Sequence, residues 1–141
     1  MSEDTERWSH LTSALAIRSG SRCEWCWEPF VPGVREPSRH HRLGGQMGGR
    51  KHNPDHDTLP NLMLLCGGRL AGVMGCHGYI TAHPAAAYTR GYLVRSGTDP
   101  AAVPVTLPSG RRVLLDAYGR YEPAPGGEWI TVLSDDTPTA H

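Results

Sequence analysis

The sequence has little of what marks a membrane protein or a strongly charged one. It contains one phenylalanine, aromatic residues make up 7% of its 141 residues, and no apolar run approaches the roughly 20 residues of a membrane-spanning helix. Positive and negative side chains balance at 14 each, so the net charge is zero and the total charge does not by itself indicate a nucleic-acid partner. We therefore expect no membrane association and a single hydrophobic core of modest size.

The first residues of the sequence also do not have the pattern of a secretory signal. Residues Met1 to Asp4 are acidic at their end and no apolar run follows, so we expect an intracellular protein. In a reducing compartment the four cysteines indicate a metal site rather than disulfides. Glycine and proline, by contrast, are plentiful at 17 and 12 residues, which favours loops and turns that a metal ion would help to stabilise.

Local sequence patterns predict an α+β protein. Trp8, Leu11 and Leu15 share one face of an amphipathic helix, and Gly20 is a suitable stop. Helices are expected at residues 5–19, 76–82 and 84–90. Strands are expected at 38–43 and 62–65, in a β-meander between 103 and 121, and at 129–133. The glycine-bearing segment 44–60 has almost no apolar residue, and an irregular loop of this length inside a compact domain is usually functional.

The four cysteines form a candidate zinc site. Cys23 and Cys26 are separated by two residues, a spacing that lets both sulfurs reach one ion from a tight turn. Cys66 and Cys76 would complete the tetrahedron, although nine residues lie between them, and His77 is the alternative to Cys76 as the fourth ligand. Because Cys23 and Cys26 neighbour a charged, loop-rich segment, we favour a structural zinc site over buried free thiols.

The middle of the chain is modestly basic. Between residues 33 and 77 the acidic residues are Glu36, Asp55 and Asp57. The basic residues of the same stretch are Arg35, Arg39, Arg42, Arg50, Lys51 and Arg69. This balance suits a phosphate-facing surface, with an ordinary solvated loop as the alternative.

Taken in order, these motifs resemble those of the HNH endonucleases, in particular the small zinc-framed members encoded by phages and prophages. The resemblance covers residues 18–95 and is carried by the order of the elements rather than by any single motif. The matching elements are Cys23-x-x-Cys26, His40-His41, Asn61-Leu62, Leu65-Cys66 and Cys76-His77. The resemblance implies a ββα-metal (His-Me finger) core in residues 21–95, preceded by a helix in 1–20 and followed by a β-meander tail in 96–141.

The resemblance also implies a role for each residue of the candidate site. His40 matches the first metal ligand, His41 the general base, Asn61 the residue that holds the loop and orients the base, and His77 the final metal ligand. These roles suit the chemistry, since a neutral histidine is a good base near neutral pH and a divalent ion stabilises the charge on a cleaved phosphodiester. His83 is a tentative further ligand, with a cap at a helical junction as the alternative.

The expected function is therefore that of a metal-dependent HNH endonuclease that nicks or cuts double-stranded DNA. It would use a structural Zn²⁺ and a catalytic Mg²⁺, Mn²⁺, Ni²⁺ or Zn²⁺. The resemblance further implies the cytoplasm of a bacterial host and phage terminase subunits as partners in DNA packaging or processing. The alternative is a non-catalytic, zinc-stabilised module that binds nucleic acid or docks to the terminase. His41 discriminates between the two, because a binding module needs no base.

Overall fold

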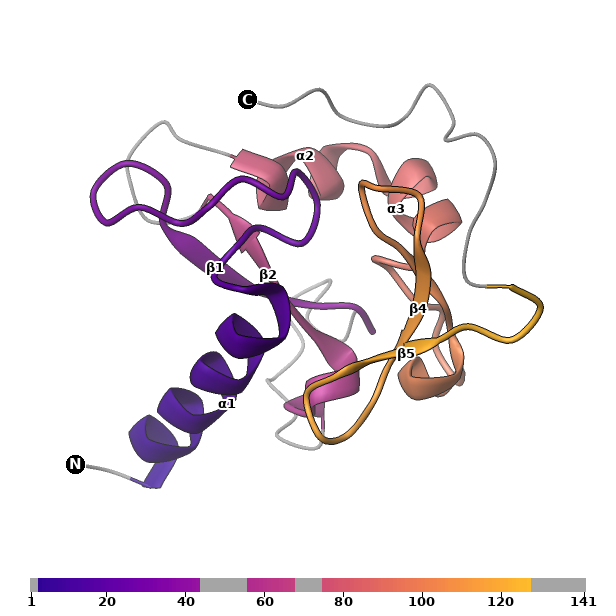
Figure 1. Ribbon diagram of the computed structural model, residues 1–141, viewed down its shortest axis with the longest axis horizontal. Coiled ribbons are helices and arrows are strands. Elements are labelled where there is room, and N and C mark those ends of the chain that lie inside the picture. The colour runs from indigo at the N-terminus through magenta and orange to yellow at the C-terminus, as the bar shows by residue number, and fades with distance from the viewer. Residues whose placement is uncertain (1–2, 44–55, 68–74, 128–141) are drawn as a thin grey trace.

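The computed structural model describes residues 3–43, 56–67 and 75–127, which form three α-helices and two small antiparallel sheets (Figure 1). The helices are α1 (Glu3–Ser19), α2 (Gly75–Ala82) and α3 (Pro84–Arg90). The strands are β1 (Pro37–His41), β2 (Leu62–Cys66), β3 (Val105–Thr106), β4 (Arg112–Leu115) and β5 (Tyr121–Pro123). The predicted α+β class is confirmed, whereas the strand expected at 129–133 and most of the 44–60 loop lie outside the described residues. No helix in the described part is both long and apolar enough to cross a membrane.

α1 and α3 each end just before a glycine, as the sequence predicted. Gly20 follows α1 with a φ of 66°, and Gly91 follows α3 with a φ of 82°, both in the left-handed region that favours glycine. A Cβ at Gly91 would also lie 1.9 Å from the carbonyl oxygen of Pro104. Both the backbone angle and the available space therefore require glycine after α3.

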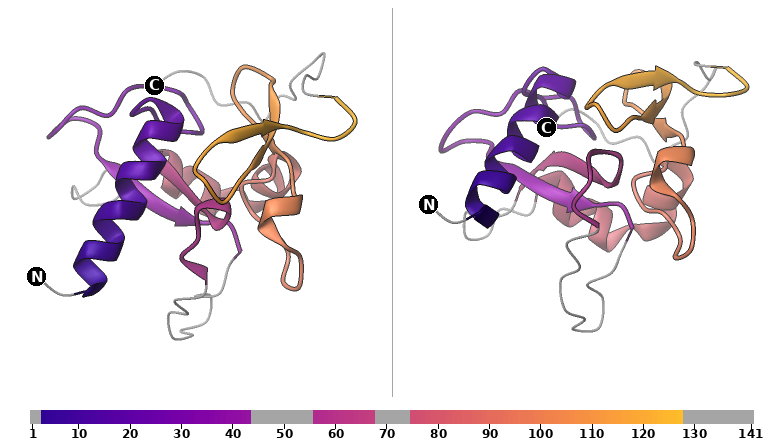
Figure 2. Two further views of the ribbon diagram at one scale, coloured as in Figure 1. Left: turned by 60° about the horizontal axis from the view of Figure 1, so that its bottom comes forward. Right: turned by 90° about the horizontal axis from the view of Figure 1, so that it is seen from below.

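β1 and β2 form an antiparallel pair with helices on both faces (Figure 2). Successive strand residues point to opposite faces, and the side chains of β2 accordingly pack in two clusters. Leu62 and Leu64 pack with Leu15 of α1, while alternate β2 residues join the larger core that contains Ile80 of α2. This arrangement explains why all 5 residues of β2 are buried.

The strand pair has two chemically different ends. β2 finishes at Cys66, at what we call the cysteine end, and β1 finishes at His41, opposite Leu62, at what we call the histidine end. α2 packs against β2 and carries Cys76 and His77 side by side near its start. One helix thus supplies a residue to each of the two candidate sites.

β3, β4 and β5 form the predicted β-meander, with β4 in the centre. The inward side chains Val105, Val113 and Leu115 pack in the same core as Trp25 and Tyr92. The meander therefore shares its core with the turn that follows Cys23.

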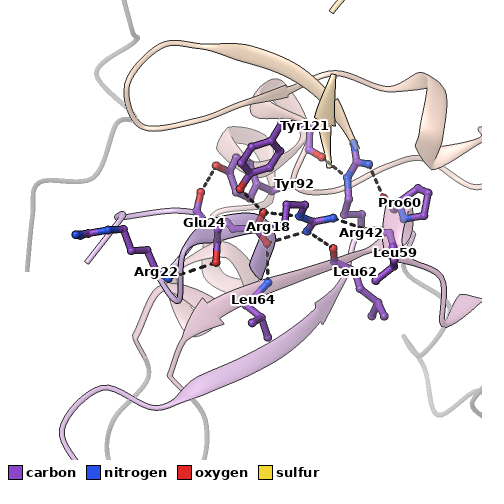
Figure 3. Close-up of polar contacts among 12 residues, drawn as sticks. Arg18, Arg22, Glu24, Arg42, Leu59, Pro60, Leu62, Leu64, Tyr92 and Tyr121 are labelled. Carbon is purple, nitrogen blue, oxygen red and sulfur yellow. Dashed lines mark hydrogen bonds and ion pairs between the residues drawn. The ribbon is translucent and has the colours of Figure 1, made fainter. Parts of the chain in front are cut away.

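A buried ion pair connects α1, this turn, β2 and β5 (Figure 3). Arg18 donates two hydrogen bonds to the Glu24 carboxylate, at 3.1 and 2.9 Å. The same carboxylate accepts the backbone amide of Leu64 at 2.9 Å and the hydroxyl of Tyr121 at 2.7 Å. Burial lowers the pKa of Arg18, but Glu24 and Tyr121 together outweigh burial and raise it overall, so the guanidinium stays charged. The network fixes four elements relative to one another.

Arg42 does not belong to the basic surface that the middle segment predicted. Its side chain is fully buried, and the guanidinium donates to the carbonyl oxygens of Gly91, Pro60, Pro100 and Val103. Burial lowers the pKa of Arg42 to about 10. Arg42 therefore anchors the chain just after β1 to the segment that follows α3. Arg50, Lys51 and Arg69 lie outside the described residues.

Candidate metal centre and histidine site

The four cysteines predicted to hold zinc come together in space. Their sulfurs lie within 4.8 Å of one another, and Cys23, Cys66 and Cys76 are buried. Around a tetrahedral zinc ion with bonds of about 2.3 Å, neighbouring sulfurs are about 3.8 Å apart. The sulfurs of Cys26 and Cys66 are 4.0 Å apart. The donor set and its spacing therefore fit a metal ion, and Cys66 and Cys76 complete the cluster despite their wide separation in sequence.

Local backbone features bring these cysteines together. The turn at Cys23 is closed by a hydrogen bond from the amide of Trp27 to the Cys23 carbonyl oxygen at 2.7 Å. Two amides point at sulfurs, with Cys66 N 3.2 Å from Cys23 Sγ and Cys76 N 3.5 Å from Cys66 Sγ. A Cβ at Gly75 would lie 2.5 Å from the Cys66 carbonyl oxygen, so glycine lets α2 begin close against the end of β2.

The crowding of thiols has an electrostatic consequence. Hydrogen bonds from Cys23, and then from the other thiols, lower the pKa of Cys66. Side-chain contacts of Cys76 with Cys23 first, and then with Cys26 and Cys66, raise the pKa of Cys76, because a second thiolate is disfavoured beside the first. A cation among the sulfurs removes this conflict, since cysteines bind metals as thiolates.

Two of the predicted metal ligands face each other, His40 from β1 and His77 from α2. Their ring centroids are 5.2 Å apart and the ring planes meet at 76°. Nε2 of His40 donates to the carbonyl oxygen of Tyr92 at 2.6 Å, and Nδ1 of His77 lies 2.6 Å from Oγ of Ser38. Burial lowers the pKa of His40 to about 3 and also lowers the pKa of His77. Both rings are therefore neutral, which is the form that binds a metal ion.

His41, the predicted general base, is bonded to a residue that sequence analysis did not single out. Its Nε2 lies 2.8 Å from Oδ1 of Asp57, and Oδ2 of Asp57 accepts from the Arg7 guanidinium at 3.3 Å. The His41 side chain is 18% exposed, whereas that of Asp57 is fully buried. In the sequence Asp57 was only one acidic residue of a basic stretch. Its place in the loop that ends at Asn61 was the one signal that could have pointed to it.

Asn61 joins the two ends of the loop that precedes it. Its buried side chain accepts the backbone amide of Leu43 at 2.7 Å through Oδ1 and donates to the carbonyl oxygen of His56 at 2.9 Å through Nδ2. Its own carbonyl oxygen accepts from the Arg42 amide at 2.8 Å. These bonds hold Leu43 and His56, the described residues on either side of segment 44–55, to the same side chain.

His83 lies at the junction of α2 and α3. Its exposed ring stacks on Tyr79 with a centroid separation of 4.1 Å. It occupies the N-cap position of α3 without a side-chain capping bond, and its Nδ1 instead donates to the Tyr79 carbonyl oxygen at 2.9 Å. The structure therefore places His83 against the last turn of α2.

Comparison with known proteins gives no relative on which to rest a function. No family model matches the chain, and searches of curated proteins and of solved structures find no similar one. The geometry of the site therefore carries the functional argument. His40 faces His77, while His41 contacts Asp57 near the loop ends that Asn61 joins. The cysteines form their own cluster.

Proposed function

We propose that this protein is a metal-dependent DNA endonuclease of the HNH type, in which β1, β2 and α2 form a ββα-metal core. The observation that carries the proposal is the approach of His40 to His77 from a strand and a helix, beside a loop that Asn61 ties at both ends. An antiparallel strand pair with a helix packed on it would hold an ion and a base on rigid supports with few residues.

His40 and His77 would hold the divalent ion. Metal-binding histidines usually bond their second ring nitrogen to a nearby oxygen, which fixes the ring and its tautomer. His40 does so with the Tyr92 carbonyl, which leaves Nδ1 for the ion, and Ser38 holds Nδ1 of His77, which leaves Nε2. When bound, the ion would stabilise negative charge on the scissile phosphate and on the leaving oxygen. Two protein ligands leave coordination positions for water and phosphate, as a catalytic site requires.

In this proposal His41 acts as the general base. Adjacent strand residues point to opposite faces, and because β1 ends at His41, the two histidines can serve different roles. His40 is buried in the core, whereas the His41 side chain is 18% exposed and can meet a water molecule. His41 would take a proton from that water, the water oxygen would bond to phosphorus, and the bond from phosphorus to the leaving oxygen would break with its electron pair.

The cysteine cluster is proposed to hold a structural zinc ion. Four sulfur ligands complete a tetrahedron and leave no position for a substrate. Cys66 ends β2 and Cys76 lies near the start of α2, so the ion would join these two elements. It would thereby hold His77 against β1.

Cleavage of supercoiled plasmid by the zinc-loaded full chain tests the endonuclease. Mg²⁺, Mn²⁺ or Ni²⁺ should support nicking or linearisation, and a chelator of these ions should stop it. His41→Ala should lower the rate by about 10²–10⁴-fold, the usual contribution of a general base. The same substitution at His10, an exposed histidine of α1, is the matched control and should leave the rate unchanged.

Two outcomes would contradict the proposal. Equal cleavage by wild type and His41→Ala would remove the role of His41. No cleavage with any ion, in protein shown to be folded and zinc-loaded, would remove the endonuclease and leave a binding or docking module. A nucleic-acid-binding module would still bind DNA with an affinity that falls steeply as salt rises.

A further inference from the structure

We propose that Asp57 is a positioning residue that fixes the orientation and the tautomer of His41, a role that rests on the function proposed above. The Asp57 side chain is fully buried, and its Oδ1 lies 2.8 Å from Nε2 of His41. The His41 side chain is partly exposed, whereas the carboxylate that it contacts is not. A buried carboxylate bonded to one of its nitrogens holds it in a single direction.

The contact determines which nitrogen of His41 acts as the base. A carboxylate accepts hydrogen bonds and donates none, so Nε2 of His41 must carry its proton toward Asp57. In the neutral ring the lone pair then resides on Nδ1. The water proton is therefore taken up at Nδ1 while the proton on Nε2 stays in place. The Asp57 carboxylate stabilises the imidazolium that forms.

Arg7 holds the carboxylate in turn. Its guanidinium lies 3.3 Å from Oδ2 of Asp57, while Oδ1 faces His41. Trp8, the next residue of α1, meets the His41 ring edge-on with a centroid separation of 6.2 Å. α1 therefore contributes to the site, although the resemblance to the HNH endonucleases begins only at residue 18.

Asn61 places Asp57 relative to His41. Its Nδ2 donates to the carbonyl oxygen of His56, the residue just before Asp57, at 2.9 Å. Its Oδ1 accepts the amide of Leu43, two residues after His41, at 2.7 Å. One buried side chain thus fixes the backbone on both sides of the contact between His41 and Asp57.

Asp57→Asn tests the tautomer with almost no change in shape. The Asn oxygen should turn toward Arg7, which can only donate, so the Asn NH₂ group should face Nε2 of His41. Nε2 would then have to accept, and the ring proton would move to Nδ1. ¹⁵N NMR spectra of the zinc-loaded full chain distinguish the two tautomers. We expect Nε2–H in wild type and Nδ1–H in Asp57→Asn.

The change of tautomer should also appear in plasmid nicking. We expect kcat of Asp57→Asn to fall about 10²–10⁴-fold with KM nearly unchanged, because Asp57 acts through the base. A merely structural role for Asp57 would change kcat without moving the ring proton of His41.

Several outcomes would overturn the positioning role. An Nδ1–H tautomer in wild type would do so without any variant, even if Asp57→Asn failed to fold. So would an Asp57→Asn protein that keeps both the tautomer and kcat of wild type, and in that case the endonuclease itself would stand. If wild type cleaves no DNA with any ion, both the endonuclease and the positioning role are wrong.

Discussion

The cysteine end and the histidine end of the β1–β2 pair differ in how completely each would surround an ion. At the cysteine end four sulfurs lie within 4.8 Å of one another, enough for a full tetrahedron. At the histidine end His40 and His77 face each other, and His41 remains 18% exposed. A closed ligand set suits a scaffold, and an open one suits chemistry on a bound substrate.

α2 joins the two ends, because Cys76 and His77 are consecutive residues near its start. Whatever holds Cys76 at the end of β2 also holds His77 opposite His40. The two ends therefore suggest different roles. A metal site with no open coordination position would align a neighbouring site that keeps open positions for substrate and water. The variants below separate the two ends.

Breaking the cysteine end should have the largest effect. Structural zinc contributes on the order of 10–16 kcal/mol to the folding of small zinc domains, which matches or exceeds the usual net stability of a domain of about 5–15 kcal/mol. Cys76→Ser should therefore lose zinc and unfold, as measured by metal content and circular dichroism. His77→Ala, one residue further on, is the matched control and should keep zinc and fold while losing cleavage. Zinc retained in Cys76→Ser and lost in His77→Ala would make His77 the fourth ligand.

Glu24→Gln tests whether the stability of the fold depends on the ion pair of Arg18 with Glu24 as well as on zinc. The variant leaves the Arg18 guanidinium buried without its carboxylate, and breaking a buried pair in this way costs about 3–5 kcal/mol. Urea unfolding with zinc present measures the loss. Combining Glu24→Gln with Arg18→Met removes the uncompensated charge and should recover part of the stability. A Glu24→Gln protein as stable as wild type would show that the ion pair does not support the fold.

Ser38→Ala tests whether the bond from Ser38 to His77 supports ion binding at the histidine end. Ser38 holds Nδ1 of His77 at 2.6 Å, and loss of such a supporting bond usually weakens metal binding about 10–100-fold. The Mn²⁺ concentration that gives half-maximal cleavage should rise accordingly, while the zinc content stays the same. Ser13→Ala, at an exposed position of α1, is the control. An unchanged Mn²⁺ requirement in Ser38→Ala would mean that this bond does not orient a ligand.

The elements that the sequence predicted correctly are those with local signals. Gly20 and Gly91 end their helices, and the apolar run of β2 is a strand buried on both faces. The cysteine cluster was predictable because a tetrahedral ion needs four ligands and the chain has four cysteines.

The features that could not be predicted from the sequence depend on contacts between distant segments. Asp57 meets His41 and Arg7, residues 16 and 50 positions away. Arg42 is buried because carbonyl oxygens as far along the chain as Val103 accept its donors. Nothing near an arginine in the sequence distinguishes such a residue from one that faces a phosphate.

The burial of His40 should make the free energy of unfolding depend on pH under acidic conditions. Burial lowers the pKa of His40 to about 3 in the folded protein, against about 6.5 when unfolded. Between these values the unfolded chain binds a proton that the folded chain does not. His40 therefore contributes its full stability above about pH 6.5, and stability falls by up to about 1.4 kcal/mol per unit as pH drops toward 3. Urea unfolding at about pH 7.5 and 5.5 measures this slope. His40→Gln, which keeps a donor for Tyr92 but does not titrate, should show a smaller slope, and equal slopes would contradict this account.

The smallest effect is expected from His83→Ala, which tests how far the histidine end extends. The His83 ring is exposed and is held by stacking and one hydrogen bond to Tyr79, so its loss should change stability by less than about 1 kcal/mol. The ion concentration for half-maximal cleavage should equal that of wild type, whereas His77→Ala should abolish ion-dependent cleavage. A raised ion requirement in His83→Ala would instead add a third protein ligand to the ion. The ion at the histidine end would then have fewer coordination positions left for water and substrate. The two ends would differ mainly in the type of their ligands.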